Sequence, residues 1–218
     1  MVSKPKFKFI GGTLCLDFVN TVGGRVGSER KGDFSYRVLS DKLTGFDDLV
    51  RWSESAGVLS RAEALKVARR AASQPSDAKS LFDRAIVVRE SLYRVCKSLL
   101  AASTPPAADV VVLNRELANA RSRKRLKFSE GGFVWSWDKP DALDRILWTV
   151  IDLAGEFLAS SALASLRQCP GDDCGWLFLD ESRNGSRQWC EMRICGNRAK
   201  LRRFRERLQG HRSVAQRH

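Results

Sequence analysis

Four of the six cysteines in this chain have the spacing of metal ligands. They form two pairs in the pattern C-x4-C-x15-C-x4-C, namely Cys169, Cys174, Cys190 and Cys195. Each pair is close enough in sequence to grip one metal ion, and the segment between the pairs is long enough for a hairpin. Four thiolates give Zn²⁺ a closed tetrahedral shell without an open position for a reactive water. The pattern therefore predicts one structural zinc ion.

Two disulfides are the alternative use of these four cysteines. Export would favour them, but the N-terminal sequence is not typical of a signal peptide, because Gly11 and Gly12 divide its apolar run and Asp17 interrupts it. We therefore expect a cytoplasmic protein with reduced thiols, which favours zinc. The remaining cysteines, Cys15 and Cys96, stand alone in apolar segments and are expected to be buried and inert.

The residues around the cysteine pairs predict how the zinc module is built. The apolar run 176–179 is typical of a strand, Asn184-Gly185 is a turn dipeptide, and 187–189 leads back to the third cysteine, which together indicate a hairpin. A helix is expected from about residue 198 to 208, with the last cysteine at its start, where the helix dipole favours a thiolate. Knuckle, hairpin and helix around one zinc ion define a treble-clef finger.

The expected C-terminal helix is strongly basic. Leu201, Phe204 and Leu208 form a narrow apolar stripe on it. Six cations flank this stripe: Arg198, Lys200, Arg202, Arg203, Arg205 and Arg207. Guanidinium groups suit phosphate oxygens and guanine edges, and a helix fixed on a zinc module presents them well to a duplex. The alternative is an ordinary solvated charged face.

The distribution of charge supports a nucleic-acid partner. The chain has 38 Lys and Arg against 25 Asp and Glu, a formal charge of +13. From Ser165 onward there are 12 basic and 6 acidic residues in 54 positions, whereas the preceding 164 positions hold 26 and 19. The excess is thus denser in the zinc module, and the basic helix lacks the wide apolar face that membrane binding needs. DNA is the expected partner, and no membrane contact is expected.

Enzymatic chemistry is not expected. The only histidines are His211 and His218, so a histidine base is excluded from the body of the chain. The sequence also offers no phosphate-binding glycine loop and no open metal site.

Residues 1–162 predict a helix-rich α+β domain with a small antiparallel sheet, followed by the zinc module in 163–218. The elements expected in the first domain are a short strand at 6–10, a loop at 23–33, helices at about 44–52, 60–72, 75–99, 105–121 and 141–160, and a hairpin around 130–132. Thr44 with Asp47 and Ser60 with Glu63 have the spacing of capping boxes.

Two stretches resemble known families. Residues 169–208, with Cys195-Gly196-Asn197-Arg198, both cysteine pairs, WLFLD and SRN, resemble the CGNR zinc finger. Upstream, LCLDFVNT resembles the opening motif of the ABATE domain, which accompanies this finger in bacterial proteins described as stress-induced transcription regulators. The resemblance implies a treble-clef finger that binds DNA and an N-terminal domain that binds an unidentified small ligand.

The resemblance also suggests residues for that ligand. Asp17, Asn20 and Thr21 match the DxxNT part of the motif, and Arg89 in VVRESL matches an arginine on a core-facing helix. The structural alternatives are turn or helix capping by Asp17 and Asn20, and an ion pair between Arg89 and Asp17. We therefore expect a DNA-binding regulator that responds to stress or a ligand and works as a homodimer with two fingers. A zinc-stabilised RNA- or protein-binding adaptor is the alternative.

Overall fold

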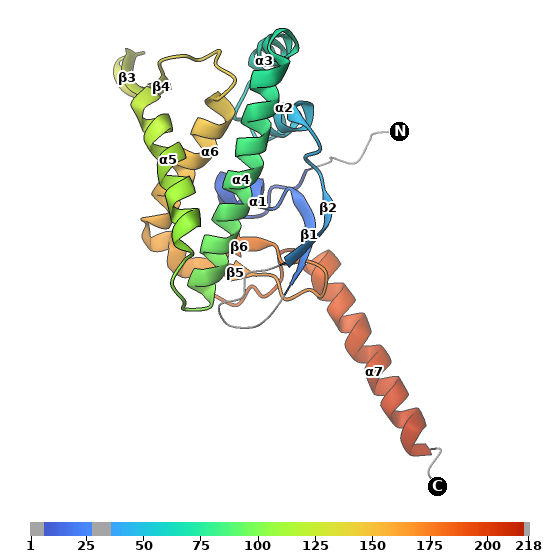
Figure 1. Cartoon of the computed structure of the whole chain (residues 1–218). Coiled ribbons are helices and arrows are strands. Elements are labelled where there is room, and N and C mark those ends of the chain that lie inside the picture. The colour runs from blue at the N-terminus through green and yellow to red at the C-terminus, as the bar shows by residue number, and fades with distance from the viewer. Residues whose placement is uncertain (1–6, 28–35, 216–218) are drawn as a thin grey trace.

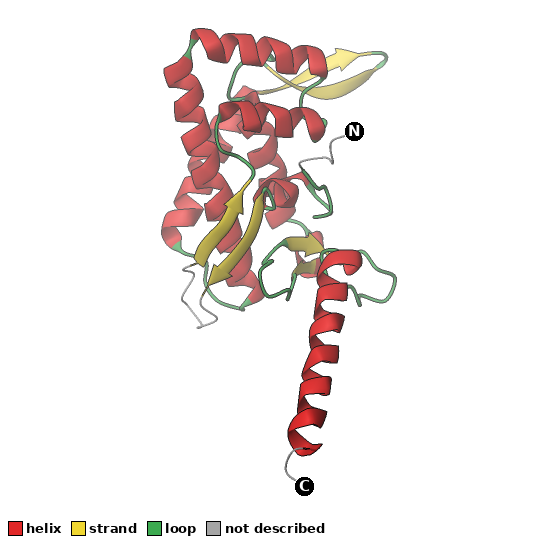
Figure 2. Cartoon of the chain, turned by 90° about the vertical axis from the view of Figure 1, so that its right-hand side faces the viewer, coloured by secondary structure: helices red, strands yellow, loops and turns green. Residues whose placement is uncertain are grey.

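The computed structural model describes residues 7–27 and 36–215, with side chains as far as residue 207. Most of these residues are helical (Figures 1 and 2). The α-helices are α1 (Leu14–Val19), α2 (Phe46–Ser55), α3 (Arg61–Ser73), α4 (Pro75–Leu100), α5 (Ala107–Arg123), α6 (Arg145–Leu158) and α7 (Asn197–Ala215). A 3-10 turn, Ser161–Ser165, follows α6, and a π-helical turn, Met192–Gly196, leads into α7.

The described strands form two-stranded antiparallel sheets. They pair as β1 (Val22–Gly27) with β2 (Tyr36–Asp41), β3 (Lys124–Ser129) with β4 (Gly132–Trp137), and β5 (Leu166–Gln168) with β6 (Leu177–Leu179). A mainly helical α+β fold with small antiparallel sheets and a C-terminal cysteine cluster is therefore confirmed. The division between residues 162 and 163 stays a prediction.

The long helix α4 is the centre of the helical body. Helices α1, α2, α3, α5 and α6 all contact it, and in Figure 1 α5 and α6 run beside it while α2 and α3 lie at one end. Its buried residues Leu81, Ala85, Val88 and Leu92 recur at three- and four-residue spacing, so one stripe faces the core. Leu99, at the end of the same pattern, is 37% exposed, whereas the adjacent Ser98 is completely buried, so the buried face has shifted by one position at the end of α4.

Two capping boxes were expected, and one forms. The Ser60 hydroxyl accepts a hydrogen bond from the Glu63 N–H, and the Glu63 carboxylate accepts one from the Ser60 N–H, so α3 begins as predicted. The box of Thr44 and Asp47 is wrong. Helix α2 begins one residue later, after Gly45, and the carboxylate of Asp48 accepts from both the N–H and the hydroxyl of Thr44.

Two further expectations near the N-terminus are wrong. Residues 7–10 are not a strand, because no strand of the described residues pairs with them, and Phe7 is buried whereas Phe9 is exposed. Lys6 lies outside the described residues. The predicted loop at 23–33 begins as strand β1, whose register with β2 shifts at Gly24, and only 28–33 fall outside the described residues.

Strand β6 does not form the hairpin expected with residues 187–189. It pairs with β5, which precedes the first cysteine. Asp180 explains the difference, because its carboxylate accepts hydrogen bonds from the N–H and hydroxyl of Ser182 and from the N–H of Arg187. The chain after β6 therefore folds around Asp180 instead of returning as a strand.

Strand β6 separates two hydrophobic cores. Leu177 and Leu179 pack into the large core of the helical body, whereas the alternate residues Trp176 and Phe178 pack with Cys169, Cys190 and Cys195. Both faces of this strand are thus buried, which explains a continuous apolar run without alternation. Among the described residues no helix is long and apolar enough to cross a membrane.

Replacing Leu177 tests whether β6 joins the two cores. Leu177 is fully buried, so Leu177→Ala should lower the free energy of unfolding by about 2–5 kcal/mol and weaken zinc retention in the same variant. Urea unfolding and zinc content measure the two effects. The matched control Leu65→Ala removes a half-exposed leucine from α3 and should change stability by no more than about 0.5 kcal/mol. A stable Leu177→Ala protein would contradict this role.

Candidate metal centre and nucleic-acid interface

The four predicted zinc ligands meet at one point. Their Sγ atoms all lie within 4.8 Å of one another, and the Sγ of Cys190 is 3.6 Å from those of Cys174 and Cys195. A tetrahedral site with Zn–S bonds of about 2.3 Å has edges of about 3.8 Å between sulfur atoms. The four cysteines therefore fit one structural zinc ion. In the part of the chain that the structure describes, all six cysteines are free thiols.

Local structure positions each pair of ligands. The short β5–β6 hairpin carries Cys169 and Cys174 in its loop, closed by a hydrogen bond from the Cys169 N–H to the Trp176 carbonyl. The second pair lies at the entrance to α7, with Cys195 inside the π-helical turn that leads into this helix. The dipole of the nineteen-residue helix favours a thiolate there. The metal would thus hold the loop 169–174 between β5 and β6, called the knuckle below, against the base of α7.

The zinc module is attached to the helical body by its backbone. The Arg25 N–H of β1 donates to the Cys174 carbonyl at 3.1 Å. A Cβ at Gly24 would lie 2.1 Å from the Asp173 carbonyl oxygen, so only glycine allows β1 to approach the knuckle this closely. Gly175, with φ +66°, makes the matching turn on the other side.

Side chains complete this attachment. The Asn20 amide donates to the Leu177 carbonyl at 2.7 Å and accepts from the Leu177 N–H at 3.0 Å. The Trp176 indole N–H donates to the Val22 carbonyl at 2.7 Å, and the Leu179 N–H donates to the Gly11 carbonyl. Asn20 therefore works as an extra strand partner for β6, which accounts for its place in the DxxNT motif.

Helix α7 leaves the body and projects from it (Figures 1 and 2). The six cations predicted to contact nucleic acid are all exposed: Arg198, Lys200, Arg202, Arg203, Arg205 and Arg207. Arg202 forms ion pairs with Asp172 and Glu206, whereas Arg198 lines a cavity beside the cysteines. The apolar stripe is not covered, since Leu201 is 56% and Phe204 is 58% exposed; the Leu208 side chain lies outside the described residues.

The cavity beside the cysteines has a volume of about 230 Å³ and is lined by cations from both parts of the chain. Lys8 and Lys42 come from the N-terminal region and Arg198 comes from α7. The Lys42 ammonium lies 4.9 Å from the centre of the Trp176 ring. Burial, followed by the charge of Lys8, lowers the pKa of Lys42. Sequence spacing gave no signal for these two lysines, because only the fold brings them to the zinc module.

The residues proposed for a small ligand do not all meet. Arg89 and Thr21 are in contact, because Nη1 of Arg89 donates to the Thr21 hydroxyl at 3.1 Å. Arg89 is fully buried and its ion pairs are with Asp41 and Glu90, so the alternative of a pair with Asp17 is wrong. Asp17 instead accepts from the Gly11 N–H at 2.8 Å. Ligand binding by these residues stays a prediction.

A second buried arginine joins this network. Arg25 from β1 donates to both carboxylate oxygens of Glu90 and to the Val19 carbonyl. Its guanidinium lies 4.1 Å from the centre of the Tyr93 ring, and its Nη1 atom has no hydrogen-bond partner among the described residues. Burial raises the pKa of Glu90, but the charges of Arg25 and Arg89 outweigh this and lower it overall. No motif pointed to Arg25, because its strand was expected to be a loop.

The two isolated cysteines are core residues, as expected, and so is Trp52. Cys15, Cys96 and Trp52 are completely buried, and Trp52 packs on Phe18 with ring centres 5.0 Å apart. Burial raises the pKa of the Cys15 thiol to about 12 and that of Cys96 further, so neither is reactive near neutral pH.

Fold and site together define a helical domain of the α+β class with an attached four-cysteine zinc module. The family model of ABATE, described as "Putative stress-induced transcription regulator", matches residues 12–167, and that of the CGNR zinc finger matches residues 165–208. The chain therefore belongs to the ABATE family and carries a CGNR zinc finger, which confirms the resemblance. A search of curated proteins gives no match.

Zinc content tests the ligand set. Cys190→Ala should reduce the zinc of the purified protein from one ion per chain to a small fraction, because three thiolates leave the shell open. Cys96→Ala, which also removes a buried thiol, should keep its zinc. Elemental analysis after dialysis measures both. Full zinc content in Cys190→Ala would show that this thiol is not a ligand.

Asp17 should make stability depend on pH. Burial raises its pKa to about 6, against hydrogen bonds from Gly11 and Ile10 that lower it. The folded state therefore keeps a proton that the unfolded state has lost, and this group's contribution to stability falls by about 1 kcal/mol between pH 5 and 7. Asp17→Asn keeps an acceptor for the Gly11 N–H and should remove this slope. Urea unfolding of both proteins across this range, with zinc present, measures it; parallel curves would contradict the raised pKa.

Proposed function

We propose that this protein is a DNA-binding transcriptional regulator that uses α7 to contact the duplex. The observation that carries the proposal is a projecting helix with six exposed cations whose base is fixed by a zinc centre. The ABATE and CGNR matches favour the same function. Nothing in the proposal requires catalysis, and the zinc ion has a structural role in it.

The geometry of α7 suits a duplex. Its nineteen residues extend about 28 Å, and an α-helix with its side chains is about 10–12 Å across, which fits the roughly 12 Å width of the major groove. Arg198 at its base and Lys42 of the neighbouring cavity extend the basic surface onto the body, whereas Lys8 in that cavity is ion-paired with Glu191. Phosphate contacts from these groups would orient the helix, and one or two guanidinium groups farther along it would read base edges.

A homodimer is part of the proposal, because one helix makes few contacts and specific recognition usually needs two half-sites. The alternative function, an RNA-binding adaptor, would use the same cations, because RNA phosphates attract Lys and Arg as DNA phosphates do. A stress signal or a small ligand would then act on the helical body. Binding to DNA, binding to RNA and the response to a ligand can each be tested by a separate experiment.

Salt dependence of DNA binding tests the proposal. Fluorescence anisotropy with a mixed-sequence duplex should show affinity that falls steeply with salt, by a slope of about −0.9 per phosphate contact. Arg203→Gln with Arg205→Gln, which removes two exposed cations of α7, should make this slope shallower by about 2 and weaken binding.

The matched control is Lys66→Gln with Arg69→Gln, which removes two exposed cations from α3. This variant should bind as the unmodified protein does. Equal losses in both variants would show that overall charge, and not α7, attracts the duplex. Much tighter binding to a structured RNA hairpin of the same length would favour the adaptor, and an unchanged slope in the α7 variant would exclude the helix as the contact.

A further inference from the structure

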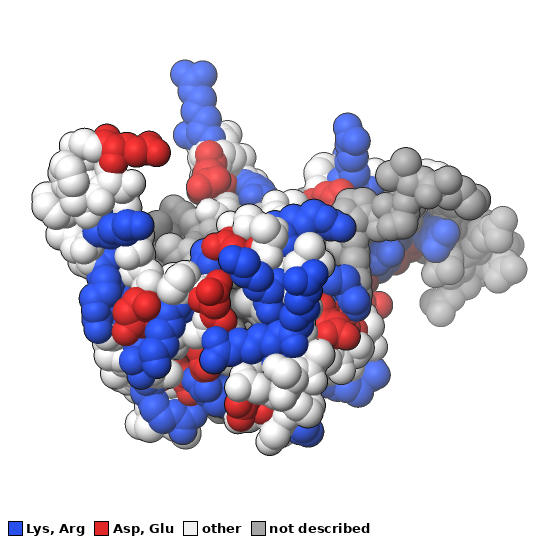
Figure 3. Space-filling model, turned by 90° about the horizontal axis from the view of Figure 1, so that it is seen from above, with Lys and Arg blue, Asp and Glu red and all other residues white. Residues whose placement is uncertain are grey.

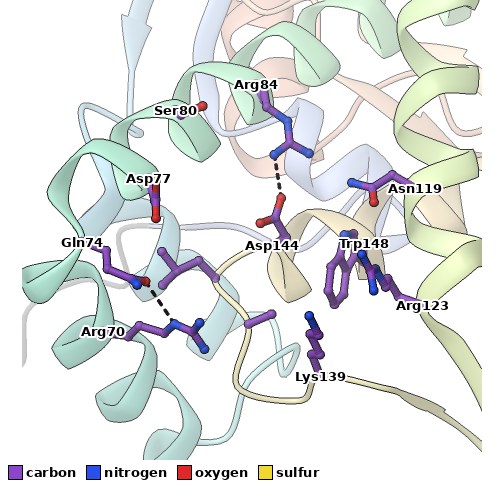
Figure 4. A pocket seen from close by; sticks show the side chains of 12 residues that line it. Arg70, Gln74, Asp77, Ser80, Arg84, Asn119, Arg123, Lys139, Asp144 and Trp148 are labelled. Carbon is purple, nitrogen blue, oxygen red and sulfur yellow. Dashed lines mark hydrogen bonds and ion pairs between the residues drawn. The ribbon is translucent and has the colours of Figure 1, made fainter.

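An open cavity lies among residues of α3, α4, α5 and α6. In Figure 1, the junction of α3 and α4 and the β3–β4 hairpin lie at one end of the helical body, and α7 projects from the other end. The volume of the cavity is about 390 Å³, within the range of small-molecule sites. Four elements meet here: the junction of α3 and α4, the end of α5, the loop 138–144 and the start of α6 (Figure 4). None of the residues suggested by the sequence motifs lines it.

Cations dominate the wall of this cavity. Arg70, Arg84, Arg123 and Lys139 line it, against the carboxylates of Asp77 and Asp144. Figure 4 shows these side chains around the opening, and Figure 3, seen from above, shows Lys and Arg gathered across this end of the molecule with Asp and Glu between them.

The cations differ in how far they are neutralised. Arg84 donates to Asp144 at 2.6 Å and to both oxygens of Glu116, so its charge is compensated and its position fixed. Arg70 hydrogen-bonds to the Gln74 side chain and to a backbone carbonyl, and Arg123 is 3.6 Å from the nearest oxygen of Asp138. Lys139 has no ion pair within the described ranges. Positive charge is therefore available to a ligand.

Two independent features also favour an anion. The indole nitrogen of Trp148, a residue of the cavity wall that is 4% exposed, has no hydrogen-bond partner among the described residues. A buried N–H without an acceptor is costly, and because this nitrogen itself has almost no exposed surface, a small shift of the wall is needed before a ligand oxygen can accept its hydrogen bond. The N-cap residues of α4 and α6, Gln74 and Asp144, both line the cavity, and neither side chain hydrogen-bonds to the N–H groups of its helix.

The remaining lining groups indicate the rest of the ligand. Asp77 and Ser80, three residues apart on α4, provide carboxylate and hydroxyl oxygens. Asn119, on α5 one turn before Arg123, provides an amide oxygen from another side of the cavity. A carboxylate repels a bare dianion but accepts hydrogen bonds from hydroxyl groups. We propose that this cavity binds a small phosphate ester that carries hydroxyl groups, with the phosphate near Lys139, Arg70 and Arg123.

NMR of the full-length, zinc-loaded protein labelled with ¹⁵N tests the site directly. Six indole N–H signals are expected from the six tryptophans, and Trp148→Phe identifies the one from Trp148. Ribose 5-phosphate, adenosine 5′-monophosphate, inorganic phosphate and sulfate are titrated at constant ionic strength. The expected result is a saturable shift of the Trp148 signal with at least one of the two esters, at lower concentration than with phosphate or sulfate. The ester that binds tighter distinguishes a sugar phosphate from a nucleotide.

Matched double variants separate the cavity from general charge. Arg70→Gln with Lys139→Gln should weaken ester binding by about tenfold or more, since two charge-assisted contacts are removed. Arg69→Gln with Lys127→Gln removes the same charge from exposed residues that do not line the cavity, and should leave binding unchanged.

Three results would overturn the proposal. The first is a Trp148 signal that none of the esters shifts in the unmodified protein. The second is an equal response to sulfate, which means an adventitious ion only. The third is equal weakening in the two double variants, which means attraction by overall charge. Because the titration of the unmodified protein decides the first two, a variant that fails to fold does not hide the answer.

Discussion

The burial of both faces of β6 is the constraint on which the rest of the structure depends. Its alternate residues belong to different cores, Leu177 and Leu179 to the helical body and Trp176 and Phe178 to the zinc module. Neither core is complete without this strand, and the Asn20 amide hydrogen-bonds to both the carbonyl and the N–H of Leu177. The zinc centre is therefore not an appendage on a flexible linker. Binding free energy at the four thiolates stabilises the strand that the helical body also needs, so metal and body are thermodynamically linked.

The same attachment decides what could be predicted from the sequence. Cysteine spacing and the Ser60 box are local chemistry, and both predictions hold. The hairpin predicted between the cysteine pairs does not form. The Asp180 carboxylate accepts hydrogen bonds from the N–H groups of Ser182 and Arg187, so the chain around Asn184-Gly185 folds about Asp180 and does not return as a strand. Strand β1 was missed because its glycines are typical of a loop, whereas Gly24 is required by the carbonyl of Asp173. Lys8 and Lys42 meet the zinc module only through tertiary structure, which no local pattern encodes.

Burying charged side chains inside the helical body costs desolvation free energy, and the position of these side chains explains what they do there. Arg25 and Arg89 converge on Glu90 and Asp41 beneath the β1–β2 sheet, which also carries the backbone contact to Cys174. Removing one partner from such a network would leave an uncompensated charge in the interior and cost several kcal/mol. The network therefore ties both strands of the sheet to α4, through Arg25 with Glu90 and Asp41 with Arg89. This structural role accounts for Arg89 and Thr21 without a ligand.

One route between the two ends of the molecule runs along α4, and a second runs along α6, which also lines the cavity and contacts the 3-10 turn beside β6. Helix α4 contributes Asp77, Ser80 and Arg84 to the distant cavity, and a hydroxyl of its Tyr93 accepts a hydrogen bond from Gln168, next to the first zinc ligand. A packed helix of 26 residues transmits a displacement along its axis but does not create one. A ligand in the cavity changes DNA affinity only if it binds one position of α4 or α6 more tightly than another. The change cannot exceed that difference in binding free energy. A ligand that fits the cavity without moving α4 or α6 would bind and leave α7 unaffected, so occupancy and regulation are separate questions for this fold.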